Sequence, residues 1–233
     1  MNRNIYDSSV DTFSPQGRLH QVEYATSAVK LGSAIVAAKS NTHVVLAGVK
    51  RSTGGLSESQ EKVFHVTNKI AISLSGLGCD GRVVLKSMRD NALNYKYTYG
   101  DEPFIPRMVT EVADDFQLKT QDASGRPYGV GVVVAGIDYA GPHIHTIQPN
   151  AIYNEVYAAA MGASSQSANT YLENNFETFP TASREELINH VIKAINTTFS
   201  NESMESSFIS VVVIGPNEDF HYLSNEEISQ FLN

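Results

Sequence analysis

Two β-rich runs separated by a short polar turn decide the fold of this chain: SAIVAAK at residues 33–39 and HVVLAGV at residues 43–49. Only Ser40, Asn41 and Thr42 lie between them, a spacing that favours two neighbouring antiparallel strands. A second pair of β-rich runs follows at residues 63–66 and 70–75. This part of the chain is therefore expected to form an antiparallel sheet.

A helical stripe precedes the first strand pair. Apolar residues from Leu19 to Val29 recur at helical spacing, and the stripe stops at Gly32, where we expect a left-handed helix cap. The residues before it, 1–17, are polar and rich in turn formers. We therefore predict an N-terminal tail over 1–17 and one domain over 18–233, since no linker or repeat divides the rest.

Strands and helices then alternate in blocks. Ser183 and Glu186 form a capping box at the start of one helix, and Ser224 caps a short terminal helix. The expected helices lie after Gly81 as far as Tyr95 and at 108–116, 164–176 and 183–199, and the further strands at 130–137, 143–148, 156–161, 208–214 and 220–223. Strands in blocks and helices in pairs favour an α+β fold of two packed antiparallel sheets with helix layers outside.

Composition narrows the function classes. The 233 residues carry 17 Lys and Arg against 25 Asp and Glu, a net charge of −8, so no phosphate-neutralising surface for nucleic acid is expected. The longest apolar stretch, 129–137, is about half of the ~20 residues that a membrane helix needs. The first residues lack the apolar core of a signal peptide, and Cys79 is the only cysteine, so we expect a location in the cytoplasm and nucleus.

The motif Gly76-Leu77-Gly78-Cys79-Asp80-Gly81 matches the dinucleotide-binding pattern. Asp101, twenty residues beyond Gly81, matches the acidic residue of that pattern. The second parallel strand that this site needs would be residues 95–99, YKYTY, which is unlike a buried parallel strand. We therefore interpret the motif as a strand-to-helix turn whose glycines allow close packing, and a dinucleotide-binding oxidoreductase stays a minor alternative.

Two further features could suggest a chemical site. His143 and His145 alternate onto one strand face, but no third ligand lies at a telling spacing. Cys79 stands at a helix start without the signature of a thiol protease around it. We expect no metal and no cofactor.

Four segments together carry a family resemblance: Tyr6-Asp7, the block FSPQGRL at 13–19, QVEYA at 21–25 and GASSQSA at 162–168. In this order and at these separations they resemble the alpha-type subunits of the 20S proteasome, from Tyr6 to about Leu232. The likeness is greatest to the eukaryotic alpha-6 class, called type 1 in animals, through Arg3-Asn4 among other residues.

The resemblance implies the four-layer αββα sandwich of the N-terminal nucleophile hydrolases. An active enzyme of that fold needs a nucleophile at the mature N-terminus whose own α-amine acts as base. Ser33 matches the nucleophile position, Val49 the carboxylate position and Lys62 the lysine position. Because Ser33 follows 32 residues and Val49 is uncharged, no catalytic residue is expected. The alternative is an amidohydrolase that uses Ser33 after cleavage at Gly32.

The resemblance also implies a gate. Seven alpha subunits form each outer ring of such particles, and their N-terminal tails close the axial pore. Tyr6, Asp7, Pro15 and Tyr24 match the cluster that holds the tails open, where Tyr and Asp can hydrogen-bond between neighbouring subunits. Ser8 stands where many alpha subunits carry Arg.

Two more sites follow from the resemblance. Lys62 matches the base of a pocket between alpha subunits that receives the C-terminal carboxylate of a regulatory particle, and Glu23, Gly32 and Leu77 match its walls. The loop that narrows the entrance beneath the gate is matched by Gly125, Arg126, Pro127, Tyr128 and Gly129.

The resulting hypothesis is a non-catalytic alpha-ring subunit that gates substrate access and docks regulators in ATP- and ubiquitin-dependent protein degradation. The expected partners are neighbouring alpha subunits in a heptameric ring, beta-ring subunits and the C-terminal tails of regulatory particles. Neither nucleic acid nor a membrane is expected to bind.

Overall fold

The computed structural model describes residues 5–50, 56, 59–199 and 204–232. The first four residues of the expected tail, with Arg3 and Asn4, lie outside this part of the chain. None of the helices described is both long and apolar enough to cross a membrane.

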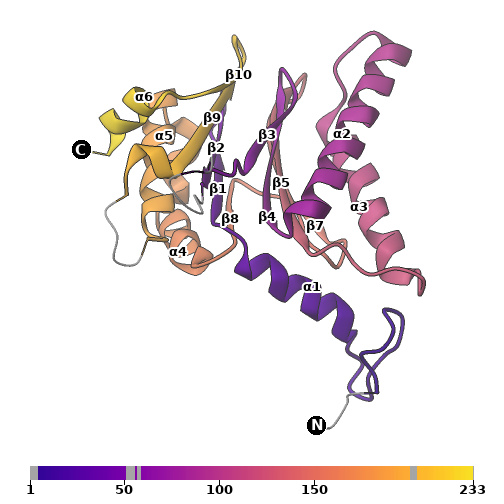
Figure 1. Cartoon of the computed structure of the whole chain (residues 1–233). Helices are drawn as coiled ribbons and strands as arrows, with labels where there is room; N and C mark the ends of the chain where they lie inside the picture. The colour runs from indigo at the N-terminus through magenta and orange to yellow at the C-terminus, as the bar shows by residue number, and fades with distance from the viewer. Residues whose placement is uncertain (1–4, 51–55, 57–58, 200–203, 233) are drawn as a thin grey trace.

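Two five-stranded antiparallel sheets form the middle of the molecule (Figure 1). The first has the order β10-β9-β2-β1-β8, with β1 Ile35–Lys39, β2 Val44–Val49, β8 Ala158–Met161, β9 Ile209–Gly215 and β10 Glu218–Tyr222. The second has the order β3-β4-β5-β6-β7, with β3 Val63–Thr67, β4 Ile70–Gly76, β5 Val130–Asp138, β6 Gly141–Ile147 and β7 Tyr153–Glu155. The predicted first strand pair is β1 and β2, in which Ala37 lies opposite Leu46.

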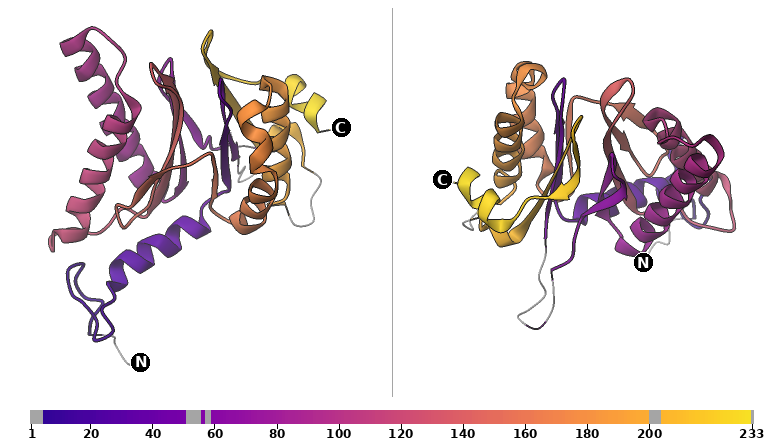
Figure 2. Two further views of the ribbon diagram at one scale, coloured as in Figure 1. Left: turned by 180° about the vertical axis from the view of Figure 1, so that it is seen from behind. Right: turned by 90° about the horizontal axis from the view of Figure 1, so that it is seen from above.

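Helices cover the outer face of each sheet (Figure 2). The second sheet is covered by α2 Gly78–Tyr99 and α3 Ile105–Gln121. The first is covered by α4 Ser165–Asn175, α5 Arg184–Asn196 and α6 Asn225–Phe231, with short 3-10 turns at Phe176–Thr181 and Ser206–Phe208. The helix α1 His20–Leu31 runs beneath the sheets in Figure 1. The four-layer αββα sandwich is thereby confirmed.

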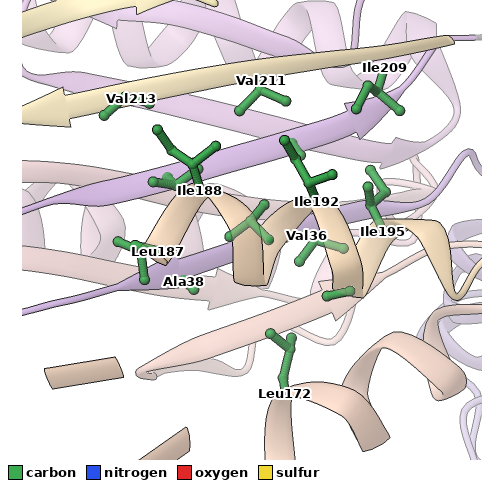
Figure 3. Packing of buried hydrophobic residues seen from close by; sticks show 14 of the residues in the cluster. Val36, Ala38, Leu172, Leu187, Ile188, Ile192, Ile195, Ile209, Val211 and Val213 are labelled. Carbon is green, nitrogen blue, oxygen red and sulfur yellow. The ribbon is translucent and has the colours of Figure 1, made fainter. Parts of the chain in front are cut away.

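Three apolar layers hold these four layers together. Strands alternate their side chains, so Ile35 and Ala37 of β1 point between the sheets while Val36 and Ala38 face the helices. The side chains between the first sheet and its helices include residues of α4, α5, β1 and β9, which Figure 3 labels. Strands buried on both faces read as nearly continuous apolar runs, which explains the sequence of β2 and β9.

The end of α1 corrects one prediction. Gly32 does not adopt a left-handed cap, because its φ is −67° and its ψ is 163°. The position requires glycine for another reason: a β carbon there would lie 2.1 Å from the backbone nitrogen of Gly76. The close approach of α1 to the end of β4, rather than a turn conformation, accounts for this glycine.

Several other elements differ from the expectation. The helix expected after Gly81 as far as Tyr95 spans Gly78–Tyr99, and the helix expected at 108–116 spans Ile105–Gln121. The short strand β7 was not predicted, because its three residues are all exposed and show no apolar alternation.

The free edge of the first sheet is partly covered by a side chain. Along the edge strand β8, the backbone N–H of Ala160 donates to Oδ1 of Asn169 (2.9 Å), and Nδ2 of Asn169 donates to the carbonyl oxygen of Ala160 (3.1 Å). Asn169 belongs to α4. Its amide thus occupies both hydrogen-bonding groups that Ala160 turns outward.

Candidate functional sites: the tail, the Lys62 cavity and the loop at 125–129

The tail is held against α1 by contacts to Asp7. The hydroxyl of Tyr24 donates to Oδ2 of Asp7 (3.2 Å), and Nε2 of Gln21 donates to the backbone carbonyl of Asp7 (2.5 Å). Burial, and next the hydrogen bond to Asp7, raise the pKa of Tyr24. Two of the four predicted gate residues therefore meet within one chain, although the resemblance suggested contacts between subunits.

A tight turn at residues 14–17 precedes the helix. The N–H of Gly17 donates to the carbonyl of Ser14 (2.8 Å), and Gly17 has a φ of +75°. Pro15 occupies the second position of this turn, where its fixed φ is favourable. The guanidinium of Arg18 then pairs with Glu23 through two contacts of 2.6 and 2.5 Å, which lower the pKa of Glu23.

The position that matches a catalytic nucleophile lies inside the chain. Ser33 is 3% exposed, and the hydroxyl of Ser75 lies 3.0 Å from its carbonyl oxygen. Val49 lies on β2, where its N–H donates to the carbonyl of Ala34, the residue after Ser33 (2.9 Å). In the chain as described, the nitrogen of Ser33 is a peptide nitrogen that follows Gly32, and the side chain at position 49 is uncharged.

Lys62 lines a cavity of about 480 Å³ between β3 and the start of α2. Only 8% of the residue is exposed, and its Nζ donates to Oε1 of Gln60 (3.0 Å). The other lining residues combine apolar and polar groups: Gln60, Glu61, Phe64, Leu74, Gly76, Leu77, Gly78, Cys79, Arg82 and Val130. A cavity with an ammonium, a guanidinium and apolar walls can accept an apolar segment that ends in an anion.

The four predicted pocket residues are placed differently. Lys62 and Leu77 line the same cavity. Gly32 is not among its lining residues, although it closely approaches Gly76, which is. Glu23 is engaged by Arg18 on α1 and is not among the residues that line the cavity of this single chain.

The loop at 125–129 is anchored by a residue that the sequence analysis did not assign to a site. Nη1 and Nη2 of Arg126 donate to the two carboxylate oxygens of Asp80 (2.6 and 2.8 Å), and the N–H of Gly129 donates to the same side chain (2.9 Å). The hydrogen bonds from Arg126 lower the pKa of Asp80. Asp80 lies in the glycine motif at 76–81. Its acidic charge within that motif was the only feature of the sequence that could have indicated an anchoring role.

Tyr128 is the aromatic residue of this loop. Its ring contacts that of Phe116 on α3, with ring centroids 4.9 Å apart. Pro127 and Gly129 are buried. The predicted pore loop is therefore fixed at both its charged and its aromatic residue.

The glycine motif forms a turn. It joins β4 to α2, and the chain then continues through α3 before the antiparallel strand β5. Residues 95–99, which a dinucleotide site would need as a strand, belong to α2. All strand pairs in the described sheets are antiparallel. The interpretation as a packing turn agrees with this topology.

His143 and His145 lie side by side on β6, with ring centroids 6.0 Å apart. His143 contacts Glu155 (3.0 Å from Nδ1) and Asp138 (3.2 Å from Nε2). In the part of the chain that the structure describes, no group of three His, Cys, Asp or Glu side chains is arranged to hold a metal ion.

Comparison with known proteins gives the family. The family model described as "Proteasome subunit" matches residues 29–214, and the N-terminal signature of A-type proteasome subunits matches residues 6–28. The chain is 41% identical over 235 residues to the alpha type-1 proteasome subunit of Dictyostelium discoideum, covering 100% of this chain and 95% of the relative. It is 36% identical over 234 residues to the alpha type-6 proteasome subunit of Saccharomyces cerevisiae, covering 100% of both.

A third relative gives the same result. The probable alpha type-6 proteasome subunit of Schizosaccharomyces pombe is 41% identical over 234 residues, which cover 100% of this chain and 86% of that protein. The four-layer fold, the family match and these full-length similarities agree. The chain therefore belongs to the proteasome subunit family, in which it is an alpha-type subunit similar to types 1 and 6.

Proposed function

We propose that this alpha-ring subunit of the 20S proteasome controls substrate access through its N-terminal tail and docks regulatory particles through the Lys62 cavity. The observation that carries the gating role is the hydrogen bond between Tyr24 and Asp7, which ties the tail to α1. A tail held at a defined helix can adopt a reproducible position, which a gate requires.

Docking is supported by the chemistry of the cavity. Lys62 supplies a largely buried ammonium, and Leu74, Leu77 and Val130 supply apolar walls. A terminal carboxylate on an apolar peptide would gain a charge-assisted hydrogen bond there. The partners in this proposal are neighbouring alpha subunits in a heptameric ring, beta-ring subunits and the C-terminal tails of regulatory particles.

A non-catalytic role is favoured over that of an amidohydrolase. Ser33 is buried, and the backbone on both its sides is engaged: the carbonyl of Gly32 accepts from Ala163 (2.8 Å), and that of Ala34 accepts from Val49 (2.9 Å). Cleavage before Ser33 would remove α1, which packs on β4 and β5 through Val29. As a non-catalytic subunit, the uncleaved chain would serve ATP- and ubiquitin-dependent protein degradation in the cytoplasm and nucleus. A fluorescent fusion of the chain can test this location.

Deletion of residues 1–13 tests the gating role. The deletion leaves the turn at 14–17 and α1 intact, so the particle should assemble with unchanged subunit content. Basal hydrolysis of a peptide substrate by the assembled particle should rise, because one obstruction of the pore is removed. Unchanged basal hydrolysis in a correctly assembled particle would contradict a gating role for this tail.

The single substitution Tyr24→Phe is the matched control for the deletion. It removes only the hydroxyl that donates to Asp7 and leaves the whole tail in the pore. Basal hydrolysis should therefore stay low, while stimulation by a regulatory particle should fall. Raised basal hydrolysis in the deletion, with reduced stimulation alone in Tyr24→Phe, would separate closing of the pore from holding it open.

A further inference from the structure

The turn at 76–81 and the loop at 126–129 interlock. Asp80 is 6% exposed, and its carboxylate accepts two hydrogen bonds from Arg126 and one from the N–H of Gly129. Charge-assisted bidentate contacts of this kind are among the stronger hydrogen bonds in proteins. Asp80 thus fixes the position of a loop that lies 46 residues away in sequence.

Backbone contacts remove the remaining freedom between the two segments. The N–H of Leu77 donates to the carbonyl of Gly129 (2.9 Å). A β carbon on Gly76, whose φ is +117°, would lie 2.2 Å from that carbonyl oxygen. A β carbon on Gly129 would lie 2.7 Å from Cδ1 of Leu77. Close packing at both glycines means that neither segment can shift without the other.

The opposite side of the same turn forms the wall of the Lys62 cavity. Gly76, Leu77, Gly78 and Cys79 all line that cavity. Asp80 follows directly and turns its carboxylate toward Arg126. A group that fills the cavity therefore contacts the residues that carry the loop.

We propose that Asp80 is a positioning residue that couples the Lys62 cavity to the loop at 125–129, so that a peptide seated in the cavity restrains this loop. The inference rests on the proposed function, in which the cavity receives a terminal carboxylate and the loop borders the entrance. It gives the glycine motif a role in regulation, because the motif is the rigid connection between the two sites.

The carboxylate is required for this coupling. An amide at position 80 would keep one acceptor oxygen in place of two, would turn an NH₂ group toward a donor of Arg126 or Gly129, and would lack the charge. Lysine at position 126 would keep the charge but lose the two parallel contacts. Asp80→Asn and Arg126→Lys should therefore loosen the loop to different degrees.

Hydrogen exchange of the assembled particle tests the proposal. Backbone amides of residues 122–129 are followed in the wild type, Asp80→Asn and Arg126→Lys, each alone and with a short apolar peptide that ends in a free carboxylate. Arg107→Gln is the matched control, since Arg107 forms an exposed pair with Glu111 on α3 (3.1 Å). Peptide affinity is measured separately for each particle.

Without peptide, Asp80→Asn should speed exchange in the loop by about ten- to a hundredfold, the effect of losing hydrogen bonds to a charged group. Arg126→Lys should give a smaller increase, and Arg107→Gln none. With peptide, the wild-type loop should exchange more slowly, whereas Asp80→Asn should bind the peptide with similar affinity and show no further protection. A variant that was merely less stable would not combine normal peptide affinity with a loop that fails to respond to the peptide.

Three results would overturn the proposal. Equal loop exchange in peptide-free wild type and Asp80→Asn would show that Asp80 does not hold the loop. A wild-type loop whose exchange does not change with bound peptide, or an Asp80→Asn loop that still responds to it, would show that the sites are uncoupled.

Failure of the wild type to bind the peptide would instead overturn the docking role of the cavity, while the peptide-free comparison would still decide the role of Asp80. If Asp80→Asn does not assemble, Arg126→Lys decides the question, because its side chain is 57% exposed.

Discussion

Lys62 combines burial with a polar partner in a way that suits a regulated site. Its ammonium donates to the amide oxygen of Gln60, which helps to stabilise the charge. A carboxylate that enters would replace part of the lost hydration of this ammonium. An anionic ligand in this cavity would therefore meet a largely buried ammonium, with the side chain of Glu61 also in the lining.

Lys62→Ala should weaken binding of a peptide with a free terminal carboxylate by about 1–3 kcal/mol, the range for losing a hydrogen bond to a charged group. Lys62→Arg should rescue this loss only in part, because the wide guanidinium needs more room than the ammonium. Fluorescence anisotropy of labelled peptides on assembled particles measures both effects. Equal binding of carboxylate and amidated peptides by the wild type would contradict the proposed role of the charge.

His145 predicts a pH dependence of stability. The residue is 5% exposed, and burial lowers its pKa below the ordinary value of about 6.5. Its charged neighbours come from four strands: His143, Glu155, Lys39 and Asp138. As the pH falls through 6.5, the unfolded chain binds a proton that the folded chain does not, so the free energy of unfolding should decrease.

His145→Gln should make this decrease smaller between pH 7.5 and 5.5, as measured by denaturant unfolding of the isolated chain at each pH. Burial also lowers the pKa of His43 and His190, so part of the slope should remain. If His145→Gln leaves the slope of the free energy of unfolding against pH unchanged, the dependence belongs to other groups.

Among the elements, α5 shows how a local signal supports the core. Its start is fixed by the capping box of Ser183 and Glu186, in which each side chain satisfies a backbone N–H of the other residue. The helix then buries Leu187, Ile188, Val191, Ile192 and Ile195 against the first sheet (Figure 3). The same capping box recurs at Ser224 on α6, which buries only Ile228.

Ser183→Ala should lower the free energy of unfolding by about 1 kcal/mol, the usual effect of losing an N-cap side chain. Ser224→Ala removes the same cap from a seven-residue terminal helix, so its effect on global unfolding should be smaller. Denaturant unfolding of the two variants measures the difference. An equal or larger loss in Ser224→Ala would mean that α6 takes part in the cooperative core.

The same local signals explain which elements could be predicted. The capping box at Ser183 and the nearly continuous apolar runs of β1, β2, β4 and β5 were sufficient, because these strands are buried on both faces. The strand β7 could not be predicted, since it is an exposed edge strand held by pairing with β6. Gly32 was assigned the wrong role because its neighbour, Gly76, lies 44 positions away and is visible only in the fold.

In the candidate sites, the residues of the motifs could be predicted from the sequence, whereas some of the residues that they contact could not. The motifs placed Tyr24 and Asp7 in one cluster, and the structure brings these two side chains together within the chain. The pair of Asp80 and Arg126 could not be predicted, because nothing in the spacing links two single charges 46 residues apart. The pocket between neighbouring subunits stays a prediction, in which Lys62, Glu23, Gly32 and Leu77 act together.

At the scale of the whole molecule, the fold determines whether the chain can act as an enzyme. Ser33→Ala should leave peptide hydrolysis by the assembled particle unchanged, because the peptide nitrogen of Ser33 cannot act as a base. Val49→Asp restores a carboxylate and should still create no new activity while residues 1–32 remain attached. Activity assays together with the intact mass of the chain check both points, and a chain that starts at Ser33 would favour the amidohydrolase.

Asn169 has a consequence for the chain before it meets its partners. An open edge strand offers unpaired N–H and C=O groups to any other strand, which makes it a starting point for aggregation. At Ala160 both groups are already bonded to the Asn169 amide, which imitates one peptide unit of a neighbouring strand. A newly made chain thus carries its own blocking group at Ala160, which opposes extension of the first sheet at this point by a strand of another copy.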